Sequence, residues 1–256
     1  MSSASFMADY TAIFSITTRD SDCFSKCQAS ALLSFLQETG LRAMGNLGLT
    51  RELMLERYHA IWILSRTLYQ LEEPLFLGDT IIIRGRCRSA HGMGLYYDSE
   101  ILRSRVKIGE ALSLWLPVDA EQRTLYPASQ ISELSDILLT AQGGKQLSQL
   151  TLPEPLFPIH RRQVEYSHVD MNGHLNNSRY ADLICNAISL DKLGGAYISS
   201  FQISYLSECL LGCFLTLSAR NEGKLWYVKG EGDDGLIRFK SVVELAPPSS
   251  NELWGR

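Results

Sequence analysis

The chain repeats one order of predicted elements, and this repeat constrains the fold more than any other feature of its 256 residues. A strand-like run at residues 10–16 precedes a loop, a helical pattern at 28–45 and a series of further strand-like runs. The second half follows the same order, with a strand at 161–167, a loop and a helical pattern at 177–190. The later strand-like runs lie at residues 60–69, 80–84, 95–103, 110–118, 196–205, 213–219, 225–231 and 237–244. This order predicts two copies of one α+β domain.

Two offsets align the copies. At an offset of 148 (170 − 22), the apolar positions of the two helical patterns coincide, so the core face repeats. The polar positions do not repeat, because the loop before the first helix has few of the polar groups found in the second. At the offset of 148, Asp22 falls on Asp170, but Phe24 falls on Asn172 and Lys26 on His174. At a second offset of 134 (208 − 74), Pro74 falls on Glu208. We therefore expect one copy to carry chemistry and the other to bind.

The polar loop of the second copy has Asp170, Asn172 and His174 at alternate positions. A helix start has unpaired backbone N–H groups and a partial positive charge, so it can stabilise a carbonyl oxygen that becomes negative in acyl transfer. A carboxylate or imidazole in a partly desolvated cleft can act there as a general base. The alternative is structural, with Asp170 and Asn172 in a turn and Asn176 as the helix cap. The crowding of polar residues in one loop favours a site.

The same loop carries a family motif. The pattern Asp-x-Asn-x-His-x-Asn-Asn-x-x-Tyr begins at Asp170, and the later motifs are Tyr205-Leu206-Ser207-Glu208-Cys209, Trp62-Ile63-Leu64-Ser65-Arg66 and Ser113-Leu114-Trp115. Over residues 10–245 the chain resembles the acyl-(acyl carrier protein) thioesterases of plastids and bacteria. The resemblance implies an α+β fold of two tandem hotdog domains, in which an antiparallel sheet wraps a long helix. Gly173 departs from the plant pattern, which has Gln at that place.

The resemblance also implies where the functional residues lie. The catalytic positions in the second domain are Asp170, Asn172, His174 and Glu208. We expect apolar residues of the first domain to line the acyl tail, and arginines near the catalytic loop to meet the acidic carrier protein. These substrate-binding residues are Leu32, Phe35, Leu36, Trp62, Arg161, Arg162 and Arg179. The expected boundaries are 1–130 for the first domain, 131–156 for a linker rich in Ser, Gln, Gly and Pro, and 157–256 for the second domain.

Cys209 suggests a different mechanism, since a Cys, a His and an Asn can form a nucleophilic triad. A strand would place Glu208 and Cys209 on opposite faces, so a Glu208 in the cleft would turn the thiol away. We therefore expect Cys209 not to be the nucleophile.

The expected function is hydrolysis of fatty acyl-(acyl carrier protein) to free fatty acid and acyl carrier protein, which ends chain elongation. Two alternatives stay open, a thioesterase of the same fold acting on acyl-coenzyme A and a non-catalytic protein that only binds acyl groups. Comparable turnover of coenzyme A esters would indicate the first alternative, and tight binding without turnover the second.

Composition limits the partners. A net charge of −4 argues against an extended nucleic-acid surface. No apolar run approaches the length that spans a bilayer, and no basic start precedes an apolar run at Met1 to Phe6. The six cysteines lack paired C-x-x-C spacing, so we expect no metal, no disulfide framework and a reducing compartment, the cytoplasm. We expect no cofactor, and a monomer or homodimer.

Overall fold

The computed structural model describes residues 9–91, 93–140 and 143–247, which group into two compact units. As far as they are described, Met1–Phe14, Phe35–Thr67 and Thr80–Ser148 form the first unit, and Ser15–Ser34, Leu68–Asp79 and Gln149–Arg256 form the second. The second unit thus takes in two segments from the first half of the sequence. The expectation based on Met1 to Phe6 lies outside the described residues.

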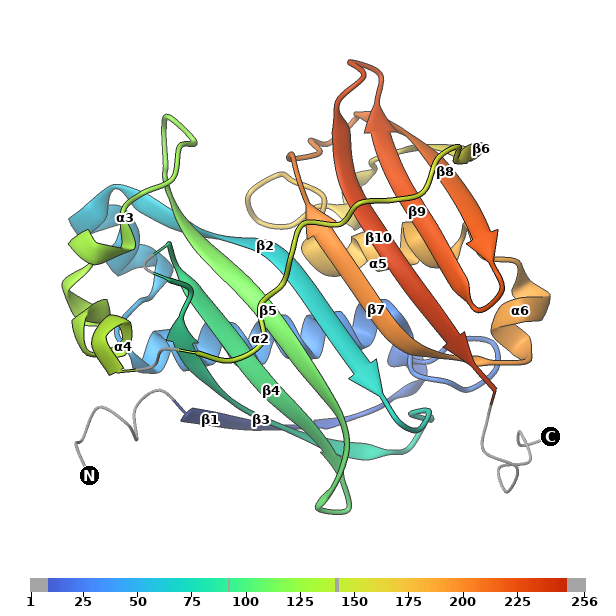
Figure 1. Cartoon of the computed structure of the whole chain (residues 1–256), viewed down its shortest axis with the longest axis horizontal. Coiled ribbons are helices and arrows are strands. Elements are labelled where there is room, and N and C mark those ends of the chain that lie inside the picture. The colour runs from blue at the N-terminus through green and yellow to red at the C-terminus, as the bar shows by residue number, and fades with distance from the viewer. Residues whose placement is uncertain (1–8, 92, 141–142, 248–256) are drawn as a thin grey trace. The chain divides into compact units, whose positions relative to one another are not determined.

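The first unit contains a sheet with the strand order β1-β3-β4-β5-β2 (Figure 1). Its strands are β1 (Asp9–Ser15), β2 (Ala60–Leu71), β3 (Thr80–Ser89), β4 (Leu95–Arg103) and β5 (Val106–Asp119). The helix α2 (Ala29–Asn46) buries Leu36, Ala43 and Met44, whose spacing puts them on one face. A shorter helix, α3 (Arg51–Tyr58), starts at Thr50, whose hydroxyl accepts the N–H of Leu53 at 3.3 Å.

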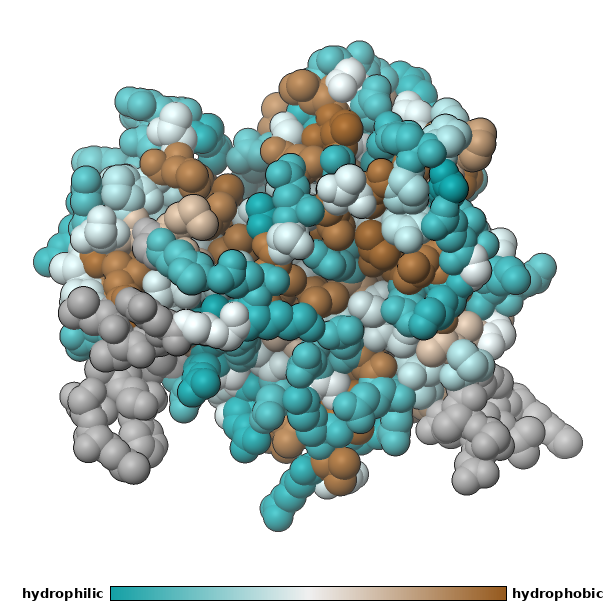
Figure 2. All heavy atoms as spheres, in the orientation of Figure 1, coloured by the Kyte–Doolittle hydropathy of each residue, from teal (hydrophilic) through white to brown (hydrophobic). Residues whose placement is uncertain are grey.

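The second unit contains a sheet with the strand order β7-β10-β9-β8-β6 (Figure 1). Its strands are β6 (Phe157–Gln163), β7 (Tyr197–Tyr205), β8 (Phe214–Glu222), β9 (Leu225–Gly232) and β10 (Ile237–Ala246), and neighbouring strands pair antiparallel. Burial alternates along β10, where Phe239, Val243 and Leu245 face the core. Figure 2 shows a mixed surface, with hydrophobic patches among hydrophilic side chains.

The helix of the second unit is much shorter than the predicted pattern at 177–190. A 3₁₀ turn, η5 (Asn177–Arg179), leads into α5 (Tyr180–Cys185). The chain then tightens, because the N–H of Ala187 bonds the carbonyl oxygen of Ile184 at 3.1 Å in an i to i+3 pattern. Ser189 begins a separate short helix, α6 (Leu190–Gly194). The prediction of one continuous helix was therefore wrong in its extent.

The strand predicted at 161–167 also lies elsewhere, because β6 ends at Gln163. A 3₁₀ turn, η4 (Tyr166–His168), replaces its predicted end, and a ring nitrogen of His168 accepts the N–H of Glu165 at 3.0 Å. This local bond competes with strand pairing.

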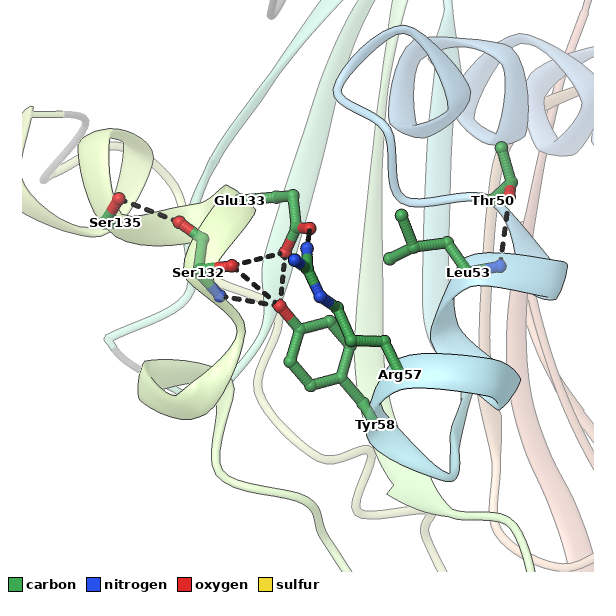
Figure 3. Close-up of polar contacts among 7 residues, drawn as sticks. All are labelled: Thr50, Leu53, Arg57, Tyr58, Ser132, Glu133 and Ser135. Atoms are coloured by element: carbon green, nitrogen blue, oxygen red, sulfur yellow. Dashed lines mark hydrogen bonds and ion pairs between the residues drawn. The ribbon is translucent and has the colours of Figure 1, made fainter.

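The segment predicted as a linker at 131–156 begins with two short helices, η3 (Ser132–Leu134) and α4 (Ser135–Thr140), and a further 3₁₀ turn, η2 (Ala128–Gln130), lies just before it. Glu133 attaches η3 to α3 within the first unit (Figure 3). Its carboxylate accepts hydrogen bonds from Arg57 and from the Tyr58 hydroxyl, both at 2.5 Å. The start of this segment is therefore held by specific contacts.

The two loops that precede the helices repeat the same set of backbone–backbone hydrogen bonds, which confirms the predicted duplication. The offsets of 148 and 134 relate their hydrogen bonds. Each bond is given from N–H to carbonyl oxygen, first in the first loop and then in the second. Asp22 to Lys26 (2.8 Å) matches Asp170 to His174 (2.9 Å), and Cys27 to Leu75 (2.8 Å) matches Leu175 to Cys209 (2.7 Å). Gly78 to Ile16 (2.9 Å) matches Gly212 to Val164 (2.8 Å). Positive φ angles repeat as well, at Ser25 (61°) and Gly173 (75°).

Candidate active site

Asp170 shapes the polar loop of the second unit. Its carbonyl oxygen accepts the N–H of Gly173 at 3.0 Å, and its Oδ1 accepts the N–H of Asn172 at 2.8 Å, which forms an Asx turn. The φ of +75° at Gly173 lies in the left-handed region, where glycine carries no Cβ penalty. No partner of Asp170 Oδ2 is recorded among the described residues. One carboxylate oxygen thus builds the turn and the other is available.

The structural alternative is confirmed for Asn176. Its Oδ1 accepts the N–H of Ser178 at 3.0 Å and the Ser178 hydroxyl at 2.9 Å, so it caps η5. Asn176 is therefore an N-cap, and Asp170 is a turn former that keeps one oxygen for another role.

The segment that contains Glu208, Cys209 and Leu210 pairs with this loop, and the pairing brings Glu208 close to His174. The N–H of Leu175 bonds the carbonyl oxygen of Cys209 at 2.7 Å, and His174 forms a β-bridge with Leu210. These contacts place His174 Nε2 at 3.4 Å from Glu208 Oε2. The imidazole is 19% exposed and the carboxylate 45%, so one partner is enclosed while the other reaches solvent. The imidazole can therefore hold the carboxylate in place while the carboxylate stays accessible to a water molecule.

Two backbone N–H groups near this pair make no hydrogen bond within the described part of the chain, those of His174 and Asn177. The equivalent N–H in the other loop, that of Lys26, donates to Asp22 Oδ1 at 2.9 Å. The second loop thus leaves open the His174 N–H, a donor whose equivalent in the first loop is used internally. Such donors can hold the oxygen of a polarised carbonyl.

Cys209 lies in a different environment from Glu208. Its side chain is buried, with 1% exposure. Burial raises the pKa of the Cys209 thiol above its ordinary value of 9.0. β7 ends at Tyr205, so the separation of the two side chains comes from an irregular segment and not from strand alternation. A thiol that stays protonated is a poor nucleophile.

The thiol environment leads to a chemical prediction. Iodoacetamide at pH 7.5 is expected to alkylate exposed Cys23 at least about tenfold faster than Cys209, because reactivity follows the exposed thiolate. Peptide mass spectrometry after timed quenching measures both rates in one sample. Alkylation of Cys209 as fast as Cys23 in the folded protein would contradict its assignment as an inert buried thiol.

Arg238 supports this site and was not singled out from the sequence. Its guanidinium, with 13% of the side chain exposed, donates to Ser207 Oγ at 2.8 Å and to Asp234 Oδ2 at 2.5 Å. Its carbonyl oxygen accepts the N–H of Leu206 at 2.8 Å. Arg238 therefore holds the segment that presents Glu208. The available sequence signal was a charge between two apolar residues, Ile237 and Phe239, in a predicted strand.

The expected arginine cluster has separate partners. Arg161 pairs with Asp233 at 2.8 Å and lies over the ring of Phe214. Arg179 pairs with Asp182 at 3.1 Å. Arg162 is exposed, and its side chain makes no ion pair or hydrogen bond within the described ranges.

The expected acyl-binding residues also divide. Phe35 stacks on Phe14 with centroids 4.5 Å apart, and Leu36 is 2% exposed. The indole N–H of Trp62 is buried without a partner in the described structure. Leu32 instead lines a cavity of the second unit.

Across the described ranges, no group of His, Cys, Asp and Glu side chains has an arrangement suited to a metal ion. None of the described helices combines the length and the apolar character needed to cross a membrane.

Comparisons with known proteins cover most of the chain. The acyl-ACP thioesterase N-terminal domain family matches residues 7–132, and the acyl-ACP thioesterase C-terminal domain family matches residues 157–232. A chloroplastic dodecanoyl-[acyl-carrier-protein] hydrolase of Cinnamomum camphora is 24% identical over 224 residues, which are 81% of this chain. The chain spans 56% of that relative's length.

Solved structures show the same fold. An acyl-ACP thioesterase of Bacteroides thetaiotaomicron matches with a TM-score of 0.81 at 18% identity, covering 96% of this chain and 100% of its own. The 12:0-ACP thioesterase of Umbellularia californica matches with a TM-score of 0.81 at 17% identity, covering 93% and 97%. The predicted α+β fold of two tandem hotdog domains is therefore confirmed.

Proposed function

Because the chain belongs to the acyl-ACP thioesterase family, we propose that it hydrolyses fatty acyl-(acyl carrier protein) to free fatty acid and acyl carrier protein, which ends chain elongation. The observation that carries this proposal is the contact of His174 with Glu208 at 3.4 Å beside the Asp170 turn. The degenerate first loop has Lys26 and Pro74 in place of this pair. Catalysis is therefore assigned to the second loop alone.

The proposed reaction begins with a water molecule. Asp170 and Glu208 share its activation, one as general base and the other as orienting group, while His174 bonds Glu208 and Asn172 positions the water. The water oxygen attacks the thioester carbonyl carbon, and the N–H groups of His174 and Asn177 hold the developing oxyanion. Collapse breaks the carbon–sulfur bond, and the proton taken from water passes to the departing sulfur.

The test is free-thiol release from acyl carrier protein and coenzyme A substrates that carry the same acyl chains. The proposal expects a higher kcat/KM for the carrier-protein substrate. Equal values would favour an acyl-coenzyme A thioesterase, and binding without release of thiol would favour a non-catalytic acyl-binding protein.

The acyl tail is proposed to lie beside α2 and β2 of the first unit, near Phe35, Leu36 and Trp62. These side chains are apolar and at least half-buried, as a tail site requires. The unpaired indole N–H of Trp62 supports a ligand there, because a buried donor without a partner is uncommon.

Enlarging Leu36 to Trp is expected to shorten the preferred acyl chain, because added volume excludes the tail end. Each methylene excluded is expected to cost about 0.8 kcal/mol of binding free energy, which lowers kcat/KM roughly fourfold. Turnover over a series of chain lengths measures the shift, and thermal unfolding checks the fold. Leu32→Trp is the matched comparison, since Leu32 lies on the same helix but faces the cavity of the second unit. A shift with Leu32→Trp alone would move the tail into that cavity.

Arg161 and Arg162 on β6 are proposed to meet the acidic carrier protein, with Arg179 in a smaller role because Asp182 already pairs with it. The whole chain is acidic, so docking requires a local basic surface.

Arg162→Glu is expected to raise the KM for the carrier-protein substrate roughly tenfold at low salt, and to spare a small acyl thioester. Salt titration of KM on both substrates measures the effect. Arg84→Glu, an equal charge change on β3, is the control. Equal losses for both arginine variants would show that overall charge, and not a β6 surface, governs docking.

Domain boundaries at 1–130, 131–156 and 157–256 remain our proposal, supported by the family matches to 7–132 and 157–232. We also place the protein in the cytoplasm, since all six cysteines are free thiols, as in a reducing compartment.

A further inference from the structure

A cavity of about 470 Å³ lies within the second unit. The loop that contains Asp22 and Lys26 contributes to its lining, whereas His174 and Glu208 do not. This volume is in the range of small-molecule sites, roughly 300 to 1,000 Å³. Most of its wall is apolar and comes from the start of α2, the end of β2 and the start of β7. The apolar wall includes Ala29, Leu32, Tyr69, Leu71, Leu75 and Ile198.

The loop at this cavity has the architecture of the catalytic loop without its chemistry. Asp22 forms the same Asx turn as Asp170, with its Oδ1 at 2.8 Å from the N–H of Phe24. Lys26 replaces the imidazole, and its Nζ donates to the carbonyl oxygens of Leu193 and Ala196, which fasten the loop to the connection before β7. The cavity therefore lies next to a loop that lacks the residues proposed for hydrolysis.

The charges in the wall balance. Lys26 and Arg179 are the cations of the lining, and Asp22 and Asp182 are its anions. Arg179 bonds Asp182 at 3.1 Å, and Lys26 Nζ already donates to the carbonyl oxygens of Leu193 and Ala196. An anionic ligand would therefore meet two carboxylates and two cations that already have partners, whereas an uncharged chain leaves these contacts intact. Asn186 on the rim makes no side-chain hydrogen bond within the described structure and can bond a neutral polar end.

We propose that this cavity is a second, non-hydrolytic binding site for an uncharged single-chain lipid, that is, a linear apolar chain with a neutral polar end such as a hydroxyl. The apolar wall from Leu32 to Ile198 takes the chain, and the balanced rim takes the neutral end. This inference does not depend on the proposed hydrolysis, because binding is measured separately from turnover.

The experiment is calorimetric titration of the full chain with 1-dodecanol and with dodecanoate. Two dodecanol sites per chain are expected, one of them lost in Asn186→Trp, whose larger ring projects into the cavity. Leu190→Trp is the matched control, since Leu190 is 62% exposed and does not line the cavity. Ala196→Phe is a second, independent variant in which a larger side chain from the wall fills the cavity. Thermal unfolding verifies that each variant is folded. At the site lost in Asn186→Trp, dodecanoate is expected to bind at least about tenfold more weakly than dodecanol, because its carboxylate would lie in a wall that already holds Asp22 and Asp182 and would compete with Asp182 for Arg179.

Retention of both sites in folded Asn186→Trp and Ala196→Phe would overturn the inference. Equal or tighter binding of dodecanoate at this site would overturn the assigned ligand class. Loss of thioester turnover in both variants, with Leu190→Trp unaffected, would also overturn it by placing the cavity on the substrate path. Absence of turnover in the parent chain would count against the proposed function alone.

Discussion

Asp170→Asn is expected to lower kcat for acyl-(acyl carrier protein) by about a hundredfold or more, the scale of a lost general base or its orienting group. Asn retains an Oδ1 that accepts the N–H of Asn172, so the turn survives while the carboxylate charge is lost. Steady-state thiol release measures kcat, and thermal unfolding confirms that the loop change leaves the protein folded.

The duplication supplies the control for this experiment. Asp22→Asn makes the same substitution in the equivalent Asx turn, in a loop that has neither His174 nor Glu208. Its kcat is expected to stay within about threefold of the parent, as is that of Cys209→Ala, because neither loses a catalytic group. If Asp22→Asn and Asp170→Asn lose activity equally, the carboxylate of Asp170 is structural. An acyl-cysteine trapped on Cys209 would show that the thiol is the nucleophile.

Glu208→Gln is expected to lower kcat by about a hundredfold as well, because Gln keeps the size of the side chain but cannot take a proton from water. His174→Ala is expected to have a comparable effect, since the imidazole contacts Glu208 Oε2 at 3.4 Å. The double variant is expected to lose less than the product of the two single effects, because groups that act as a unit are non-additive.

Glu165→Gln is the control for Glu208→Gln, since Glu165 is an exposed carboxylate of the same unit and lies at the start of the loop. It is expected to retain nearly full kcat. Strictly multiplicative losses in the double variant would show that His174 and Glu208 act independently, and full activity of Glu208→Gln would exclude Glu208 from the water chemistry.

The strands and the duplication could be predicted from the sequence, because both depend on local patterns. Alternation of side chains is a property of each strand alone, and the predicted run at 95–103 coincides with β4. The first helix differs from its prediction by one residue at each end, 28–45 against Ala29–Asn46. The offsets of 148 and 134 identified equivalent loop positions, since a turn and its hydrogen bonds depend on a few neighbouring residues.

The tertiary structure decided the features that depend on residues far apart in the chain. The contact of His174 with Glu208 exists because two segments pair through Leu175 and Cys209. The second helix ended at Cys185 although its apolar pattern continues, because i to i+3 bonds compete with helix propagation there. Burial, and not strand alternation, set the environment of Cys209. The partners of a side chain such as Arg238 and the walls of a cavity arise from packing between distant segments, which no local pattern encodes.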